Sequence, residues 1–159
     1  MTFVASDVAA MRSIGAAIAD AMQSIAQPFV IALEGELGAG KTTLVAGVLE
    51  RLGFKGHARS PTYTLIEPYE FGARSVYHLD LYRLADPSEV EALGLRDLLL
   101  PHSVFLIEWP ERGGAAIPAA DLTVRIQYAA NTSGREIELL AGSKSGESVL
   151  RRLPATAKS

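Results

Sequence analysis

Apolar residues recur along the chain at helix and strand spacings. Residues 6–25 carry apolar side chains three to four positions apart, which predicts an amphipathic helix that ends before Pro28. The continuous apolar run 29–35 predicts a strand that is buried on both faces. After a glycine-rich turn, residues 42–53 predict a second helix that stops at Gly53.

The rest of the chain predicts further strands and short helical turns. We expect strands at 2–5, 63–69, 75–82, 103–109, 121–129 and 135–142, with one hairpin joining the second and third and another joining the last two. Residues 86–101 predict short helical turns. Together these elements predict a single-domain, P-loop NTPase-like α/β fold with a mixed sheet flanked by helices. We expect an ATPase domain at 1–142 and a C-terminal helix and tail at 143–159.

Length and composition narrow the class of protein. The chain has 159 residues, a length typical of one domain, and its net charge of −3 argues against a strongly basic nucleic-acid surface. A protein of this charge can still act on RNA through a partner. The sequence has no cysteine, which excludes disulfides and thiolate metal sites. Its start lacks a signal-peptide pattern and no apolar run suggests a membrane span, so we expect a cytoplasmic protein.

The stretch GELGAGKT, Gly35 to Thr42, matches the phosphate-binding pattern G-x-x-x-x-G-K-[ST]. Glycines allow backbone N–H groups to wrap a phosphate chain, and the following helix adds its positive N-terminus. We expect Lys41 to reach the β- and γ-phosphates and Thr42 to bind Mg²⁺. The nucleotide-binding set is then Glu36, Leu37, Gly38, Ala39, Gly40, Lys41, Thr42, Thr43 and Trp109. No N-K-x-D guanine motif occurs, which favours ATP over GTP.

Two acids that follow apolar runs compete for the metal. Glu108 ends the run VFLI, as in a Walker B strand, and we expect it to bind Mg²⁺ together with Thr42. The alternative is a solvated glutamate at the end of a strand. Asp80 then takes a second task, and our hypothesis is that it places the attacking water. Its alternative is an edge residue paired with Arg83.

Other polar and aromatic residues near these segments allow two interpretations each. For His78 a packed or hydrogen-bonded histidine is favoured over a metal ligand, and for Arg83 a salt bridge is favoured over a phosphate contact. Thr62 is either a catalytic switch residue that senses the γ-phosphate or an ordinary loop threonine. Trp109 either caps the core or packs over the nucleotide or a partner.

Four pieces in order, GELGAGKTTL, SPTYTL, HLDLYRL and IEWPE, make the chain resemble the bacterial TsaE (YjeE) family. The resemblance covers about residues 28–111, and Glu36 stands where the family often has aspartate. It implies a P-loop ATPase of tRNA threonylcarbamoyladenosine (t6A) biosynthesis that works with TsaB and TsaD and meets tRNA through that complex. It implies that ATP hydrolysis resets or activates the TsaB–TsaD pair, and it also assigns Thr42 and Glu108 to Mg²⁺.

Two rival functions are compatible with a phosphate-binding loop. A small-molecule kinase needs an acceptor pocket and a mobile arginine-bearing lid, and the only candidate lid, 86–99, has a single arginine, Arg96. A nucleotide-dependent adaptor would bind ATP tightly without turning it over. Phosphate release without a phosphorylated product distinguishes an ATPase from both.

Overall fold

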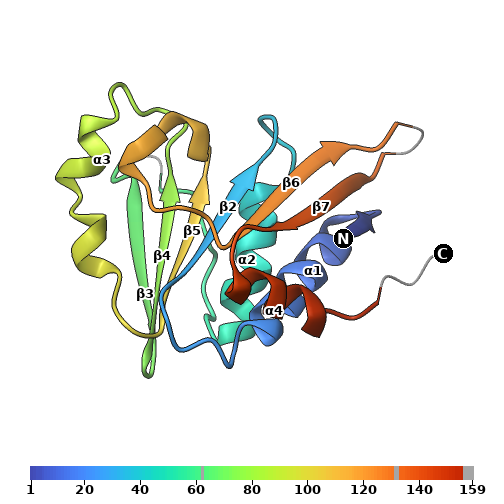
Figure 1. The fold of residues 1–159 in the computed structure, drawn as a ribbon. Helices are drawn as coiled ribbons and strands as arrows, with labels where there is room; N and C mark the ends of the chain where they lie inside the picture. Colours follow the sequence, from blue (N-terminus) through green and yellow to red (C-terminus); the bar gives the residue numbers. More distant parts are fainter. Residues whose placement is uncertain (62, 131–132, 156–159) are drawn as a thin grey trace.

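A seven-stranded mixed sheet is the centre of the fold, seen in a computed structural model that describes residues 1–61, 63–130 and 133–155 (Figure 1). The strands are β1 Thr2–Ala5, β2 Phe29–Glu34, β3 Ile66–Phe71, β4 Arg74–Asp80, β5 Ser103–Glu108, β6 Leu122–Tyr128 and β7 Arg135–Ala141. Their order across the sheet is β1-β7-β6-β2-β5-β4-β3. The four inner strands β6, β2, β5 and β4 run parallel, whereas β3, β7 and β1 pair antiparallel with their neighbours.

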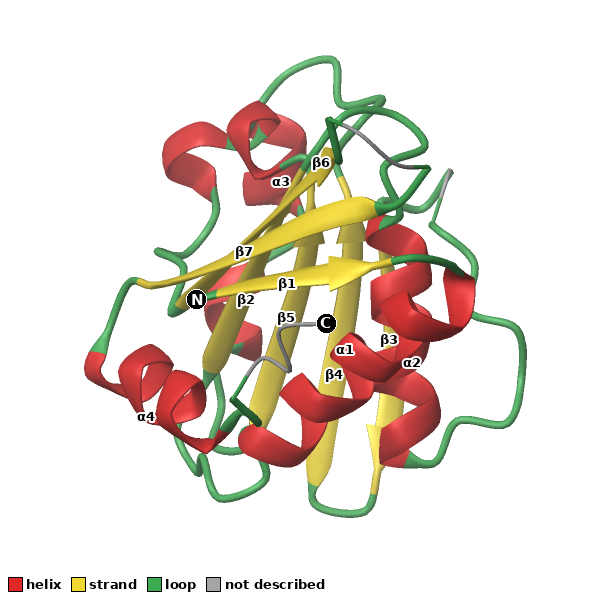
Figure 2. Ribbon diagram, turned by 90° about the vertical axis from the view of Figure 1, so that its right-hand side faces the viewer, coloured by secondary structure: helices red, strands yellow, loops and turns green. Residues whose placement is uncertain are grey.

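Helices cover both faces of the sheet (Figure 2). They are α1 Val8–Ala21, α2 Lys41–Leu52, α3 Ser88–Ala92 and α4 Lys144–Arg152, with 3₁₀ turns η1 Leu95–Leu98, η2 Pro110–Arg112 and η3 Gly114–Ala116. Leu44 of α2 packs in one core cluster with Leu106 of β5. The preceding residue on that strand, Phe105, packs in a second cluster with Val90 of α3. Since successive strand residues point to opposite faces, α1 and α2 lie on one face and α3 on the other.

The predicted mixed α/β fold is confirmed, and the strand boundaries near the loops are corrected. The strand expected at 63–69 starts only at Ile66, because Leu65 has a left-handed φ of 61° and the residues before it form a turn. The strand expected to reach residue 82 ends at Asp80, where the chain turns away from the ladder. The two expected antiparallel pairs belong to the same sheet, one on each side of its parallel centre.

The C-terminal helix α4 is anchored to the sheet by a capping serine. Ser143 Oγ accepts from Gly146 N at 3.1 Å and donates to Asp121 Oδ1 at 2.6 Å. Val149 and Leu153 complete the anchor by joining the main core cluster. The domain boundary at 142 stays a prediction. No described helix has both the length and the apolar character that crossing a membrane requires.

Helices α1 and α2 approach each other through glycines. A Cβ on Gly47 would lie 2.2 Å from the Arg12 carbonyl oxygen, and one on Gly15 would lie 2.2 Å from the Leu44 carbonyl oxygen. Both obstacles are backbone atoms, which cannot rotate away as a side chain can. This contact sets the distance of α1 from the helix that follows the phosphate-binding loop.

Gly47→Ala is expected to destabilise the protein by about 2–3 kcal/mol, because overpacking forces the two helix backbones apart. On an isolated helix the same change would stabilise the helix by about 1 kcal/mol. A loss of stability would therefore show that α1 and α2 are in close contact at Gly47. Urea unfolding measures the effect. Ser13→Ala on the exposed side of α1 is the control and should change stability by less than about 0.5 kcal/mol. Equal stability of Gly47→Ala and wild type would contradict the close approach.

Candidate functional site

The glycine-rich loop joins the end of β2 to the start of α2. Gly35 has φ 155° and a Cβ there would lie 2.7 Å from the Ile126 carbonyl oxygen. Gly40, with φ 112°, immediately precedes the first residue of α2. These positions demand glycine, since L side chains rarely adopt such dihedrals. No side chain in the described part of the chain caps α2, so its N-terminal N–H groups are available to an anion.

Lys41 lies inside this loop. Its side chain is 5% exposed, and Nζ donates to the carbonyl oxygens of Gly35 at 2.6 Å and Glu36 at 2.9 Å. The ammonium also lies 4.2 Å from the centre of the Trp109 ring. Desolvation lowers the pKa of Lys41, and the nearby carboxylates, Glu108 foremost, oppose that shift. A desolvated cation whose hydrogen bonds go to carbonyl oxygens gains from an anion bound in the loop.

The two acids lie side by side at the carboxyl ends of neighbouring parallel strands. The register pairs Asp80 of β4 with Glu108 of β5. Glu108 Oε1 accepts a hydrogen bond from Thr42 Oγ1 at 2.9 Å and lies 2.8 Å from His78 Nε2. Glu108 is only 3% exposed, so it is not the solvated strand-end residue that was the alternative. The loop and the acid are therefore adjacent, as the sequence predicted.

Thr42 and Glu108 fit a magnesium ion that is shared with phosphate. Mg²⁺ prefers hard oxygen ligands and usually takes one or two from protein, with phosphate oxygens and waters as the rest. A hydroxyl and a carboxylate 2.9 Å apart at the N-terminus of α2 match that pattern. Among the described residues no group of three or more His, Cys, Asp or Glu side chains could enclose a metal. Thr42 and Glu108 are therefore the two side chains that could hold a phosphate-bound ion.

Asp80 is held by two donors of its own chain. Its Oδ1 accepts from the Tyr82 backbone N–H at 3.0 Å, and its Oδ2 accepts from the Ser60 hydroxyl. The expected salt bridge of Arg83 is absent from the described residues, and Arg83 is exposed. Asp80 is thus not the edge residue paired with Arg83. The role of Thr62 stays a prediction, because residue 62 lies outside the described residues.

A cavity of about 290 Å³ brings most of the predicted residues together. It is lined by Leu37, Gly38, Gly40, Lys41, Thr42, Thr43, Ser60, Asp80, Tyr82, Glu108 and Trp109. The predicted residue Glu36 contributes its carbonyl to Lys41 instead. Sequence reasoning missed Ser60 and Tyr82, although both lie within the motifs SPTYTL and HLDLYRL that it singled out.

Trp109 forms a wall of this cavity. Its backbone is left-handed, with φ 57°, which turns the chain directly after β5. The ring lies 4.9 Å from that of Tyr82, and the Arg112 guanidinium lies 5.2 Å from the Tyr82 ring. Trp109 also packs against the α3-side core cluster. The core-cap interpretation therefore describes its contacts, and packing over the nucleotide or a partner stays a prediction.

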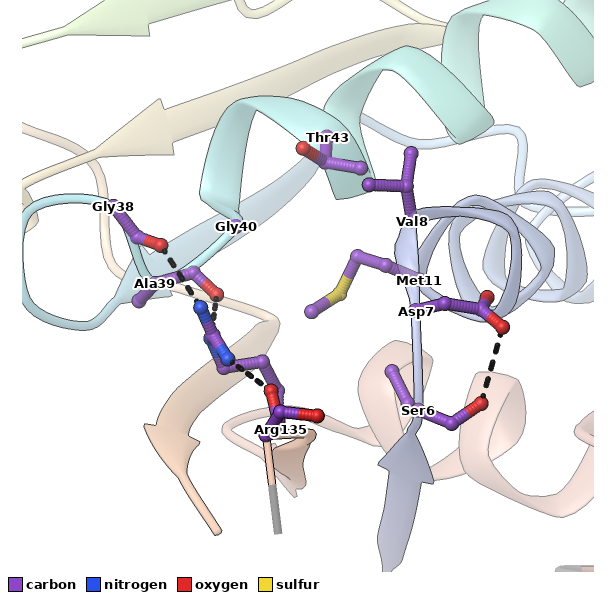
Figure 3. Close-up of a pocket in the computed structure, with 11 residues that line it drawn as sticks. Ser6, Asp7, Val8, Met11, Gly38, Ala39, Gly40, Thr43 and Arg135 are labelled. Atoms are coloured by element: carbon purple, nitrogen blue, oxygen red, sulfur yellow. Dashed lines mark hydrogen bonds between the residues drawn. The ribbon is translucent and has the colours of Figure 1, made fainter.

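A second cavity, of about 250 Å³, also adjoins the loop (Figure 3). Gly38, Gly40 and Thr43 line both cavities, and Ala39 lines only this one. Arg135 at the start of β7 donates to the Ala39 carbonyl oxygen at 3.2 Å. The sequence offered no signal for Arg135, because nothing in its neighbourhood shows that β7 begins beside the loop.

Comparison with known proteins identifies the family. The family model described as "Threonylcarbamoyl adenosine biosynthesis protein TsaE" matches residues 5–137. The chain belongs to the TsaE family. It is 46% identical over 121 residues to a Haemophilus influenzae protein named for tRNA threonylcarbamoyladenosine biosynthesis, covering 76% of this chain and 75% of that one. A Bacillus subtilis TsaE is 40% identical over 126 residues, covering 79% and 78%.

The TsaE fold is also found in a solved structure. The crystal structure of Bacillus subtilis YdiB superposes with a TM-score of 0.77 at 27% identity, covering 95% of this chain and 91% of that one. The resemblance inferred from the four motifs is therefore confirmed at the level of the family and of the fold. Glu36, Thr42, Asp80 and Glu108 all lie within the matched range.

Proposed function

We propose that this TsaE-family protein is a Mg²⁺-dependent ATPase of tRNA t6A biosynthesis. It acts with TsaB and TsaD in the cytoplasm, where tRNA is modified, and meets tRNA through that complex. The observation that supports hydrolysis is the convergence of Lys41, Thr42, Asp80 and Glu108 on one cavity beneath the phosphate-binding loop. The pathway follows from the names of the relatives.

Each residue has a task that its contacts support. Loop backbone N–H groups and the start of α2 bind the phosphates, and Lys41 neutralises charge on the β- and γ-phosphates. Thr42 and Glu108 hold Mg²⁺, which when bound neutralises phosphate charge in the transition state. Asp80 accepts a hydrogen bond from the attacking water and orients it. Trp109 closes the site on the side of the Lys41 ammonium.

The second cavity suits the nucleoside end of ATP. Gly40 and Thr43 line both cavities, so a phosphate chain wrapped by the loop can extend from the first cavity into the second. Met11 offers an apolar surface for a base, and Asp7 offers hydrogen-bond acceptors. Arg135 braces the loop between the two cavities. This arrangement supports a reacting phosphate on the side of Asp80.

Asp80→Asn is expected to slow ATP hydrolysis by about 10²-fold, since a neutral amide orients and polarises water poorly. Affinity for ATP should change by less than about threefold, because Asp80 contacts no residue of the loop in the hydrogen bonds above. Phosphate release at saturating ATP measures the first effect and calorimetry the second. Asp97→Asn, an exposed aspartate in η1, is the matched control. A wild-type rate in folded Asp80→Asn would overturn the assignment of Asp80 to water placement.

The experiment for the whole proposal is steady-state ATP hydrolysis with and without a TsaB–TsaD pair, with modified tRNA measured in the same reaction. We expect phosphate release without a phosphorylated small molecule, and more modified tRNA when all three proteins are present. Tight ATP binding without turnover, even with the partners, would instead support the non-hydrolysing adaptor. A phosphorylated acceptor would support the kinase.

The structure gives the kinase alternative little support. Arg96, the single arginine of the candidate lid, lies in η1 and lines a cavity with Glu91 and Asp97. No described residue lines both that cavity and the cavity beneath the loop. An arginine that serves phosphoryl transfer has to reach the transferred group. We therefore retain the ATPase.

A further inference from the structure

His78 is a fully buried polar residue beside the proposed magnesium site. It lies on β4, two positions before Asp80, and its side chain has no solvent exposure. Nε2 lies 2.8 Å from Glu108 Oε1, the oxygen that also accepts from Thr42. Two side chains from different elements, β4 and α2, therefore hold one oxygen of the carboxylate.

We propose that His78 is a positioning residue that orients the Glu108 carboxylate for Mg²⁺ through a hydrogen bond donated by Nε2–H. This inference rests on the proposed function, because it assigns His78 a task toward the metal of that site. It gives His78 no direct contact with the metal or with ATP.

The other ring nitrogen determines which tautomer is present. His78 Nδ1 is buried and has no hydrogen-bond partner in the described part of the chain. A buried N–H without an acceptor is more costly than a buried lone pair, and Glu108 needs a donor. Nε2 is therefore the ring nitrogen that carries the proton donated to the carboxylate.

The backbone of Glu108 is fixed by the sheet, but its side chain is not. Leu33 of β2 and Asp80 of β4 are its partners in the parallel ladders on either side. These ladders leave the carboxylate free to rotate about its side-chain torsions. Thr42 is itself a proposed magnesium ligand, so its hydroxyl oxygen would bind the metal while its O–H donates to Glu108. His78 is the donor to Glu108 that has no proposed bond to the metal.

Three substitutions separate positioning from simple packing. Glutamine at 78 can place an amide N–H near the position of Nε2, whereas the shorter asparagine reaches only the position of Nδ1. Leucine fills the space without any donor. We expect His78→Gln to behave like wild type, and His78→Asn and His78→Leu to lose the orienting hydrogen bond.

The measurement is ADP affinity by calorimetry, in EDTA and across a Mg²⁺ titration. The Asn and Leu variants should need about 10-fold more Mg²⁺ than wild type to reach the same ADP affinity. A loss of metal affinity of about 10-fold is typical when a residue that supports a metal ligand is replaced. Their affinity in EDTA should stay within about twofold of wild type, because the loop and Lys41 are unchanged. If His78→Leu does not fold, the comparison of His78→Gln with His78→Asn still decides the test, because only glutamine can replace the Nε2–H donor.

The tautomer is tested without any ligand. Nitrogen-15 spectra of histidine-labelled wild-type protein should show His78 protonated at Nε2. Protonation at Nδ1 alone would overturn the inference. An equal loss of ADP affinity in EDTA and in Mg²⁺ would also overturn it. So would an Asn variant with the same Mg²⁺ requirement as the Gln variant. If wild-type protein shows no Mg²⁺-dependent ADP binding, the proposed function fails and this inference with it. If wild type responds to Mg²⁺ and all three variants match it, only the role of His78 fails.

Discussion

Lys41→Ala is expected to lower the rate of ATP hydrolysis by about 10³-fold, the upper range for removing one preorganised charge from a water-excluded site. Lys41 is 5% exposed, and its ammonium lies within the loop that would wrap the phosphates. Alanine leaves phosphate charge without a neutralising cation. We expect ATP affinity to fall as well, because the same charge acts on bound phosphate before reaction.

We expect the loss of ATP hydrolysis to be specific to Lys41 and to depend on the shape of its ammonium group. Lys55→Ala, in an exposed position three residues after α2 ends, is the matched control and should retain the wild-type rate. Lys41→Arg keeps the charge, but its planar fork does not replace a point charge held by the Gly35 and Glu36 carbonyls. It should therefore also be impaired. Wild-type hydrolysis in folded Lys41→Ala would show that the loop does not bind the reacting phosphates.

Glu108→Gln is expected to slow Mg²⁺-dependent hydrolysis by about 10²–10³-fold, because the amide removes the anionic ligand and keeps the shape. The amide oxygen can still accept from Thr42 Oγ1, so the fold should be preserved. Affinity for ATP in EDTA should stay within about threefold of wild type, since the loop contacts do not involve Glu108. The loss therefore concerns the metal and not the nucleotide.

A magnesium titration of hydrolysis and of ATP binding measures this difference. Glu136→Gln, an exposed glutamate on β7, is the control for loss of one negative charge. Unchanged Mg²⁺ dependence in Glu108→Gln would exclude Glu108 as the metal ligand. Asp80 would then be the acid to test as the Mg²⁺ ligand. Equal losses with and without Mg²⁺ would point to structural damage instead.

Local signals made several features predictable from the sequence. The phosphate-binding loop needs glycine at set positions, and its lysine and threonine follow at a set spacing. The pairing of Thr42 with Glu108 was also predictable, because the carboxyl ends of parallel strands meet beside that loop. The seven strands and the helices follow the apolar periods, apart from boundaries such as the start of β3 at Ile66.

Other contacts depend on register and could not be predicted. The sequence left His78 with two interpretations, and its partner became evident only when β4 was aligned beside β5. The expected partner of Arg83 does not appear in the described residues, while Asp80 is held by Ser60, 20 residues earlier in the chain. Arg135 reaches the loop from the far end of the chain. No short-range pattern encodes these pairs.

By itself, the sequence determined the class of site and the order of the elements. Backbone dihedrals and apolar periods act over a few residues, so glycine positions and strand-length runs can be interpreted without knowing what packs around them. Only the tertiary structure decided which side chains share an oxygen, line a cavity or stack on Lys41. Those contacts follow from strand order and register. Strand order and register depend in turn on the burial of apolar side chains on both faces of the whole sheet.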